Sequence, residues 1–260
     1  MSWTFGNARL TVMVMASATR TNRANRTAPA AAPGRHPSSL AALWRSSVGK
    51  KAVMAVSGLV MLAYLVAHML GNLKIFFGPD DINGYAHWLR TLGEPLLHYG
   101  WFLWLARLVL VAAVVAHGTA AYQLSRRDLK ARPVKYAHRR QRSTYATRTM
   151  RWGGVILGLF IVWHILDLTT LTVNPAAEEG HPYQNVVASF STWYSGVIYC
   201  LAMLALGLHV RHGFWSAAQT LGVNNPRRDR ALKLGANALA LLLTAGFLSV
   251  PVAVMAGLVR

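Results

Sequence analysis

The chain has 260 residues, of which 54% are hydrophobic and only 13% are charged, whereas a soluble domain normally carries about 25% charged residues. Its formal net charge of +19 would suit a nucleic-acid-binding protein, but the basic residues stand in blocks between long apolar runs, as in membrane proteins, so we exclude nucleic acid as a partner. The single cysteine, Cys200, excludes a disulfide or a cysteine-bound iron–sulfur cluster within the chain.

Residues 1–47 are rich in Ala, Thr, Arg and Pro, and we expect a disordered cytoplasmic tail there. Residues 48–260 are expected to form one membrane domain. Its five apolar runs each exceed the about 20 residues that a helix needs to cross a bilayer: 51–77, 95–124, 152–173, 187–218 and 232–258. Only helices satisfy their own backbone groups in hydrocarbon, and the runs lack the alternation of a barrel. The predicted fold class is therefore all-α, an integral membrane bundle of five transmembrane helices.

The connections between the runs indicate how the chain crosses the membrane. The segments 125–151 and 224–233 are densely basic, and so is the N-terminal tail. The other two connections hold most of the acids, namely Asp80, Asp81, Glu94, Glu178 and Glu179. Because basic connections stay in the cytoplasm, we expect a multi-pass protein of a bacterial plasma membrane with its N-terminus cytoplasmic and its C-terminus outside.

Four of the five runs carry a histidine deep inside the span: His68, His117, His164 and His209. An ionisable side chain at such a depth indicates a functional site. With a rise of 1.5 Å per residue and alternating direction, His68 and His164 fall in the outer half of the membrane, whereas His117 and His209 fall in the cytoplasmic half. Each depth-matched pair joins two different helices, as the two axial ligands of one iron must.

The two pairs predict two stacked haems, each held by two imidazoles and enclosed by four of the five helices. A lone membrane histidine is more often an interhelical hydrogen-bonding residue, but four in two depth-matched pairs favour ligation. Zinc is less suitable because no carboxylate or thiol joins either pair, and a proton path would require acids in the spans, where Asp167 stands nearly alone. Small residues that could admit a flat macrocycle lie near the ligands: Gly71, Gly118 and Gly207.

Several motifs resemble one known family. Residues 68–74 read HMLGNLK and are followed by Phe77 and Gly78, with NGY at 83–85 and LGEP at 92–95. Residues 206–222 read LGLHVRHGFWSAAQTLG. These segments are similar to the first-helix and fourth-helix signatures of the b558-type cytochrome b subunit of succinate dehydrogenase. The resemblance extends from about residue 44 to the C-terminus.

The resemblance implies a membrane anchor with two haem b groups that exchanges electrons with a quinone, expected to be menaquinone. The implied partners are a flavoprotein subunit that oxidises succinate and an iron–sulfur subunit on the cytoplasmic face, besides membrane lipid; a higher oligomer is left open. It implies that His117 and His209 hold the inner haem and that His68 and His164 hold the outer one. This chain itself is expected to have no succinate site.

The supporting residues follow from their depth. Arg107, ten residues before His117, is the expected partner of an outer haem propionate, and Lys74 and Arg211 are the other candidate cofactor-binding cations. Two regions could contact quinone. His212, Trp215 and Ser216 lie near the inner haem, and Asp167, Arg90 and His98 lie near the outer face.

Other functions remain open at this point. The same architecture serves fumarate reductases, and anchors of hydrogenases or formate dehydrogenases also bind haem between histidines. A non-redox transporter is the third alternative, although the chain shows neither an internal repeat nor paired interruptions within the spans.

Overall fold

The computed structural model describes residues 39–131, 145–174, 176 and 178–260. All regular elements in this part of the chain are helices. The expected disordered tail, residues 1–47, lies mostly outside the described residues. Its last part forms a short helix, α1 (Ser39–Arg45), directly before the first long helix.

Five described helices are long and apolar enough to cross a membrane, which confirms the predicted number of spans. They are α2 (Ser47–Leu73), α4 (Trp101–Lys130), α5 (Tyr145–Leu168), α7 (Trp193–Thr220) and α8 (Asp229–Met255). The second span starts later than its apolar run, because the chain turns at Gly100 in a left-handed conformation (φ 79°). It also continues to Lys130 and carries the basic residues at its end away from the apolar part.

Besides α1, two shorter helices were not predicted from the sequence. After a 3-10 turn (Lys74–Phe77), α3 (Pro79–Thr91) occupies the expected acidic connection. Its proline at the first position, its two early aspartates and Arg90 in its last turn match the preferences of helix ends. The predicted run 187–218 is divided, because Thr192 adopts an extended conformation that separates α6 (Pro182–Ser191) from α7.

The spans alternate in direction, so the bundle has two chemically different ends. We call the end with the last turns of α4 and α7 the basic end. There Arg127 donates to the Ser47 hydroxyl (3.1 Å) and to the Arg45 carbonyl (2.9 Å), which ties α4 to the start of α2. The opposite end, with α3, α6 and the C-terminus, is called the acidic end.

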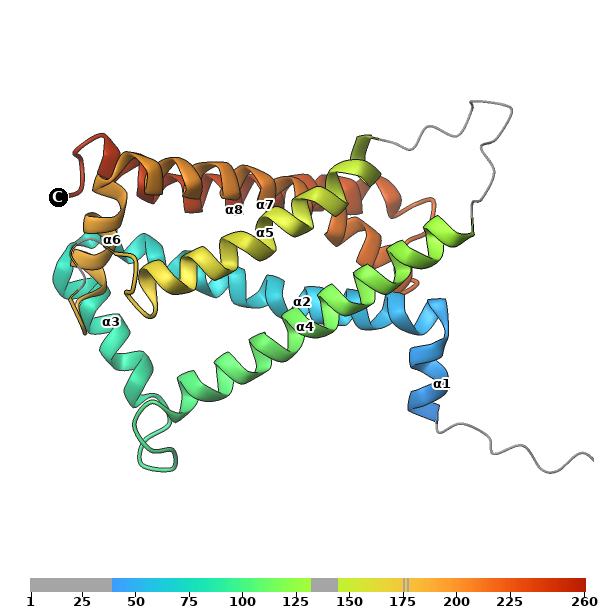
Figure 1. Ribbon diagram of the computed structural model, residues 1–260, viewed down its shortest axis with the longest axis horizontal. Helices are drawn as coiled ribbons and strands as arrows, with labels where there is room; N and C mark the ends of the chain where they lie inside the picture. The colour runs from blue at the N-terminus through green and yellow to red at the C-terminus, as the bar shows by residue number, and fades with distance from the viewer. Residues whose placement is uncertain (1–38, 132–144, 175, 177) are drawn as a thin grey trace, which may run out of the picture. The chain divides into compact units, whose positions relative to one another are not determined.

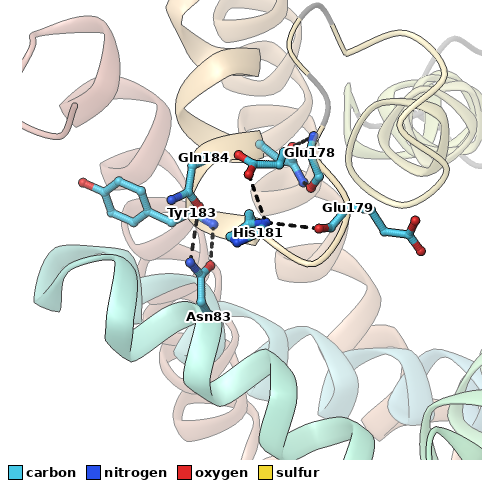
Figure 2. A network of polar contacts seen from close by, with 7 residues as sticks. Asn83, Glu178, Glu179, His181, Tyr183 and Gln184 are labelled. Carbon is cyan, nitrogen blue, oxygen red and sulfur yellow. Dashed lines mark hydrogen bonds and ion pairs between the residues drawn. The ribbon is translucent and has the colours of Figure 1, made fainter.

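Polar contacts hold the acidic end together, as Figure 2 shows. Asn83 of α3 donates to the Gln184 side chain (3.3 Å) and accepts from the Tyr183 backbone N–H (3.0 Å). The Tyr183 hydroxyl donates to the backbone carbonyl of Arg260 (3.0 Å). These bonds fix α3, α6 and the chain end against one another, so the neighbouring ends of α5 and α7 are held in place.

The apolar core lies where α2, α7 and α8 meet. Helices α7 and α8 form the closest pair (Figure 1), and α2 packs against both of them. Leu243 is fully buried in this core. Small residues permit the close approach, since a Cβ added at Gly207 would meet the Thr244 hydroxyl, and one added at Gly246 would meet Met69. In contrast, α4 packs mainly on α2 and α5 mainly on α7, and both expose many large apolar side chains that suit a lipid environment.

We predict that Gly207→Leu lowers the thermal midpoint of the detergent-solubilised protein, because the added side chain would force α7 away from α8. Overpacking of this kind costs about 1–3 kcal/mol. The matched control is Gly235→Leu on α8, where an added Cβ meets no atom within 4 Å. Thermal unfolding of the two variants side by side makes the comparison, and equal midpoints would contradict the proposed role of Gly207.

Candidate functional site

The structure brings the four membrane histidines together in the two pairs that their depths predicted. His68 of α2 and His164 of α5 lie with their ring centroids 5.7 Å apart and their planes at 79°. His117 of α4 and His209 of α7 lie 6.2 Å apart at 56°. The first pair is nearer the acidic end and the second is nearer the basic end. Their role as ligands stays a prediction.

The spacing within both pairs suits two imidazoles on one metal ion. A bond from metal to imidazole nitrogen is about 2 Å long, and the ring centre lies about 1 Å further out. Two imidazoles on opposite sides of one ion therefore have centroids about 6 Å apart. Among the described residues no group of three or more His, Cys, Asp or Glu side chains could hold a metal ion. Each pair supplies two ligands, which is the number that a haem iron accepts beside its porphyrin.

The hydrogen bonds of the rings leave the nitrogens needed for ligation available. His117 Nδ1 lies 2.9 Å from the Met54 carbonyl, and His164 Nδ1 lies 3.2 Å from the Tyr199 hydroxyl. Metal-bound histidines usually donate one ring N–H in this way and bind through the other nitrogen. His209 Nδ1 is buried with no hydrogen-bond partner in the described part of the chain, and His68 stacks on Tyr64 (5.2 Å).

Helices that carry paired histidines do not pack closely on each other. In the described residues, α2 and α5 make at most marginal backbone contact, and so do α4 and α7. A cavity of about 170 Å³ adjoins His209 and is lined by Met150, Trp152, Gly153, Ile156, Ala205 and Leu208. The rings thus approach each other across helices that are held apart, which is what a flat macrocycle between them requires.

The three glycines that the sequence indicated near the ligands have different surroundings. A Cβ added at Gly118 would meet no atom within 4 Å. Gly71 and Gly207 instead admit Tyr85 and Thr244, so they serve helix packing. Gly58 lies against the ring of His117, where an added Cβ would be 3.3 Å from Cε1. Sequence reasoning missed Gly58 because it is 59 residues away from that ring (117 − 58 = 59), and no local pattern connects the two.

The three candidate cations differ in their surroundings. Lys74 forms an ion pair with Asp81 (2.8 Å), and Arg211 donates to the Asn237 side chain (2.6 Å). Arg107 lies over the ring of Trp104 (4.9 Å), and no carboxylate in the described part of the chain lies within ion-pair distance of it. Within the described residues no hydrogen bond or ion pair engages the Arg107 guanidinium, whereas Lys74 and Arg211 each have a polar partner, so Arg107 is the one best suited to receive an anionic group.

The candidate quinone residues at the basic end lie on neighbouring turns of α7. The ring of His212 meets that of Trp215 (6.3 Å). The Trp215 indole N–H donates to Asp229 of α8 (3.1 Å). The Ser216 carbonyl accepts from the Thr220 hydroxyl (3.0 Å). His212 and Trp215 thus lie together beside the start of α8, and Ser216 follows Trp215 on the same helix.

The candidates at the acidic end are not brought together. Arg90 donates to the Ala86 carbonyl of its own helix (2.7 Å), and His98 lies against Trp101 (5.2 Å). Asp167 is only 1% exposed. Among the described residues no hydrogen bond or ion pair joins it to either of the other two. A distal quinone site built from these three residues therefore gains no support from the geometry.

Asp167 belongs instead to a buried polar cluster. It accepts hydrogen bonds from the hydroxyls of Ser189 (2.6 Å) and Tyr199 (2.9 Å), and the Ser189 hydroxyl lies 2.7 Å from that of Ser195. The three hydroxyl residues come from α6 and α7, and the sequence showed only that a membrane carboxylate needs partners.

Comparison with known proteins gives one match. Residues 123–247 match the family model described as "Succinate dehydrogenase/Fumarate reductase transmembrane subunit". The matched segment runs from the last turns of α4 into α8 and contains His164 and His209. No curated protein and no solved structure matches the chain.

We predict that Asp167→Ala destabilises the protein, because the buried Ser189 and Tyr199 hydroxyls lose the acceptor that they share. Each lost hydrogen bond contributes about 0.5–1.5 kcal/mol. The control is Asp128→Ala. Asp128 is exposed and forms a long ion pair with Arg151 (3.8 Å), and surface pairs of this kind contribute about 0–1 kcal/mol. Thermal unfolding in detergent compares the two, and an equally small effect would mean that the cluster does not stabilise the bundle.

Proposed function

We propose that the chain is the membrane-anchor cytochrome b subunit of succinate dehydrogenase, a proposal supported by the match of residues 123–247 to the family of succinate dehydrogenase/fumarate reductase transmembrane subunits. In this proposal it passes electrons between an iron–sulfur subunit and membrane quinone through two b haems. One observation carries the proposal: the four membrane histidines form two pairs. In both pairs the rings have the spacing of two imidazoles on one metal ion, and the two helices that carry them do not pack closely on each other.

The proposal assigns His68 and His164 to a haem near the acidic end, and His117 and His209 to a haem near the basic end. A bound haem would supply one-electron transfer, and the two imidazoles of each pair would hold it. Bonds from Met54 and Tyr199 hold the rings of His117 and His164 in one orientation. Arg107 would neutralise a propionate from its place over Trp104.

The proposed partners follow from the charge distribution. We place the basic end in the cytoplasm of a bacterial cell, because its connections are rich in Lys and Arg. The iron–sulfur and flavoprotein subunits would dock there, on the segments 126–151 and 212–233, of which 132–144 lies outside the described residues. Quinone, with menaquinone as the expected type, would bind beside His212, Trp215 and Ser216, close to this docking surface.

Fumarate reduction is the second candidate function. The matching family is described by both activities, and the anchor geometry is the same for electrons that move in either direction. Activity of the assembled complex with succinate and with fumarate distinguishes the two directions, while the haem assignment is common to both.

We predict two low-spin b haems per copy of the chain in the purified complex, and one haem after His68→Ala or after His117→Ala. Each substitution removes one ligand of one pair. Reduced-minus-oxidised visible spectra and a pyridine haemochrome count provide the measurement. The control is His87→Ala on α3, whose ring lies against Tyr99 and which should retain both haems. A complex without haem, or two haems in either ligand variant, would contradict the proposal.

We also predict that Gly58→Leu removes the haem near the basic end and leaves the other in place. The added side chain would occupy the position of the His117 ring, since even a Cβ would lie 3.3 Å from Cε1 and 3.4 Å from Nδ1. The expected spectrum therefore equals that of His117→Ala. Gly235→Leu, which faces open space, is the matched control and should keep both haems. An unchanged haem content in Gly58→Leu would show that this glycine does not border the site.

A further inference from the structure

The buried carboxylate of Asp167 has no cation beside it. It is 1% exposed, and within the described residues no Lys, Arg or His nitrogen lies within ion-pair distance of it. Its partners are the hydroxyls of Ser189 and Tyr199, which both reach Oδ2. Burying a carboxylate without a cation costs folding free energy, so a residue of this kind within a membrane span indicates a functional role. Its burial also keeps it from direct contact with a quinone in the membrane.

The Tyr199 hydroxyl links this carboxylate to a proposed haem ligand. It lies 2.9 Å from Asp167 Oδ2 and 3.2 Å from His164 Nδ1. A hydroxyl has one proton to donate. Because the Tyr199 proton goes to the carboxylate, the Tyr199 oxygen accepts from the Nδ1–H of His164. The two hydrogen bonds therefore run in one direction, from His164 to Tyr199 and from Tyr199 to Asp167. Nε2 is then the nitrogen of His164 that is free to bind a metal ion.

Within the described residues, no carboxylate is linked in this way to the other three proposed ligands. The Nδ1 of His117 faces the neutral carbonyl of Met54 (2.9 Å) and the Ser57 hydroxyl (3.5 Å). His209 Nδ1 is buried without a partner in the described part of the chain, and His68 is stacked on Tyr64. The two pairs are therefore electronically different, although their spacings are similar.

We propose that Asp167, acting through Tyr199, positions His164 and makes its imidazole a stronger electron donor, and that this lowers the reduction potential of the haem near the acidic end. A carboxylate behind a ligating histidine raises the basicity of that ligand. A more basic ligand stabilises ferric over ferrous iron, so the lower potential follows. Asp167 and Tyr199 are thus positioning residues of the electron path. The inference rests on the proposed function, because it requires haem between His68 and His164.

The test is a redox titration of the purified complex, with the two haems resolved by their visible bands and by the electron paramagnetic resonance of their ferric forms. Tyr199→Phe keeps the carboxylate but breaks the link, and Asp167→Asn keeps the link but removes the charge. We expect both to shift the ferric–ferrous equilibrium of one haem about tenfold toward ferrous iron, which is about 59 mV for one electron. Tyr199→Phe should also change the resonance of that haem, since its ligand ring is freed.

Two controls make the result specific. Ser189→Ala removes one hydrogen bond to Asp167 and leaves the Asp167–Tyr199–His164 chain intact. The ferric–ferrous equilibrium constant of each haem should therefore stay within about twofold of its wild-type value. The haem near the basic end should be unaffected in every variant. If Asp167→Asn fails to assemble, the comparison of Tyr199→Phe with Ser189→Ala decides the question.

The outcomes separate this inference from the function on which it rests. A wild-type complex without haem contradicts the proposed function itself. Two haems with unchanged potentials in Tyr199→Phe overturn the positioning role, even if Asp167→Asn shifts one of them, because the charge would then act through space alone. A shift of the wrong haem, or of both equally, overturns the inference as well.

Discussion

An imidazole placed inside hydrocarbon needs a partner for both of its ring nitrogens, and the structure depends on how that need is met. Unpaired polar groups are costly where no water can reach them. In His117 and in His164, Nδ1 forms a hydrogen bond within the protein. The other ring nitrogen of each is then free to bind a group placed between the two rings of its pair. Two metal-centred groups, as proposed, would meet this need at both depths and would account for the separation of the helices that carry each histidine pair.

The packing of the helices follows the same constraint. Helices α2, α7 and α8 pack against one another, and glycines such as Gly207 and Gly246 admit neighbouring side chains there. Helix α4 packs on α2 and α5 packs on α7, and Arg127 and the Asp167 cluster add polar contacts at their ends. Close packing therefore joins α4 to α2 and α5 to α7, whereas the two helices that carry each histidine pair stay apart.

The sequence predicted the parts of this architecture that depend on periodic burial and on depth. The five spans and the partners of the histidine pairs follow from apolar run length and from the fixed rise of a helix. Helix α3 was missed because it is short and polar, and α6 because its apolar residues run directly into the span α7. Tertiary contacts such as that of Asn83 with Gln184 stabilise both. Gly58 and the partners of Asp167 were missed because tertiary packing alone brings them to the site. The distal quinone site was inferred from the similar depth of Arg90, His98 and Asp167. Depth alone does not determine toward which neighbour a side chain points, and the three have different partners.

The central claim is that each haem depends on one specific pair of histidines, and the most direct test is haem content in double variants. The account predicts that His117→Ala with His209→Ala leaves one haem per chain, because both substitutions affect the same pair, and that His68→Ala with His164→Ala does likewise. It predicts that His117→Ala with His164→Ala leaves none. One haem remaining in this cross-pair variant, or none in either within-pair variant, would contradict the pairing.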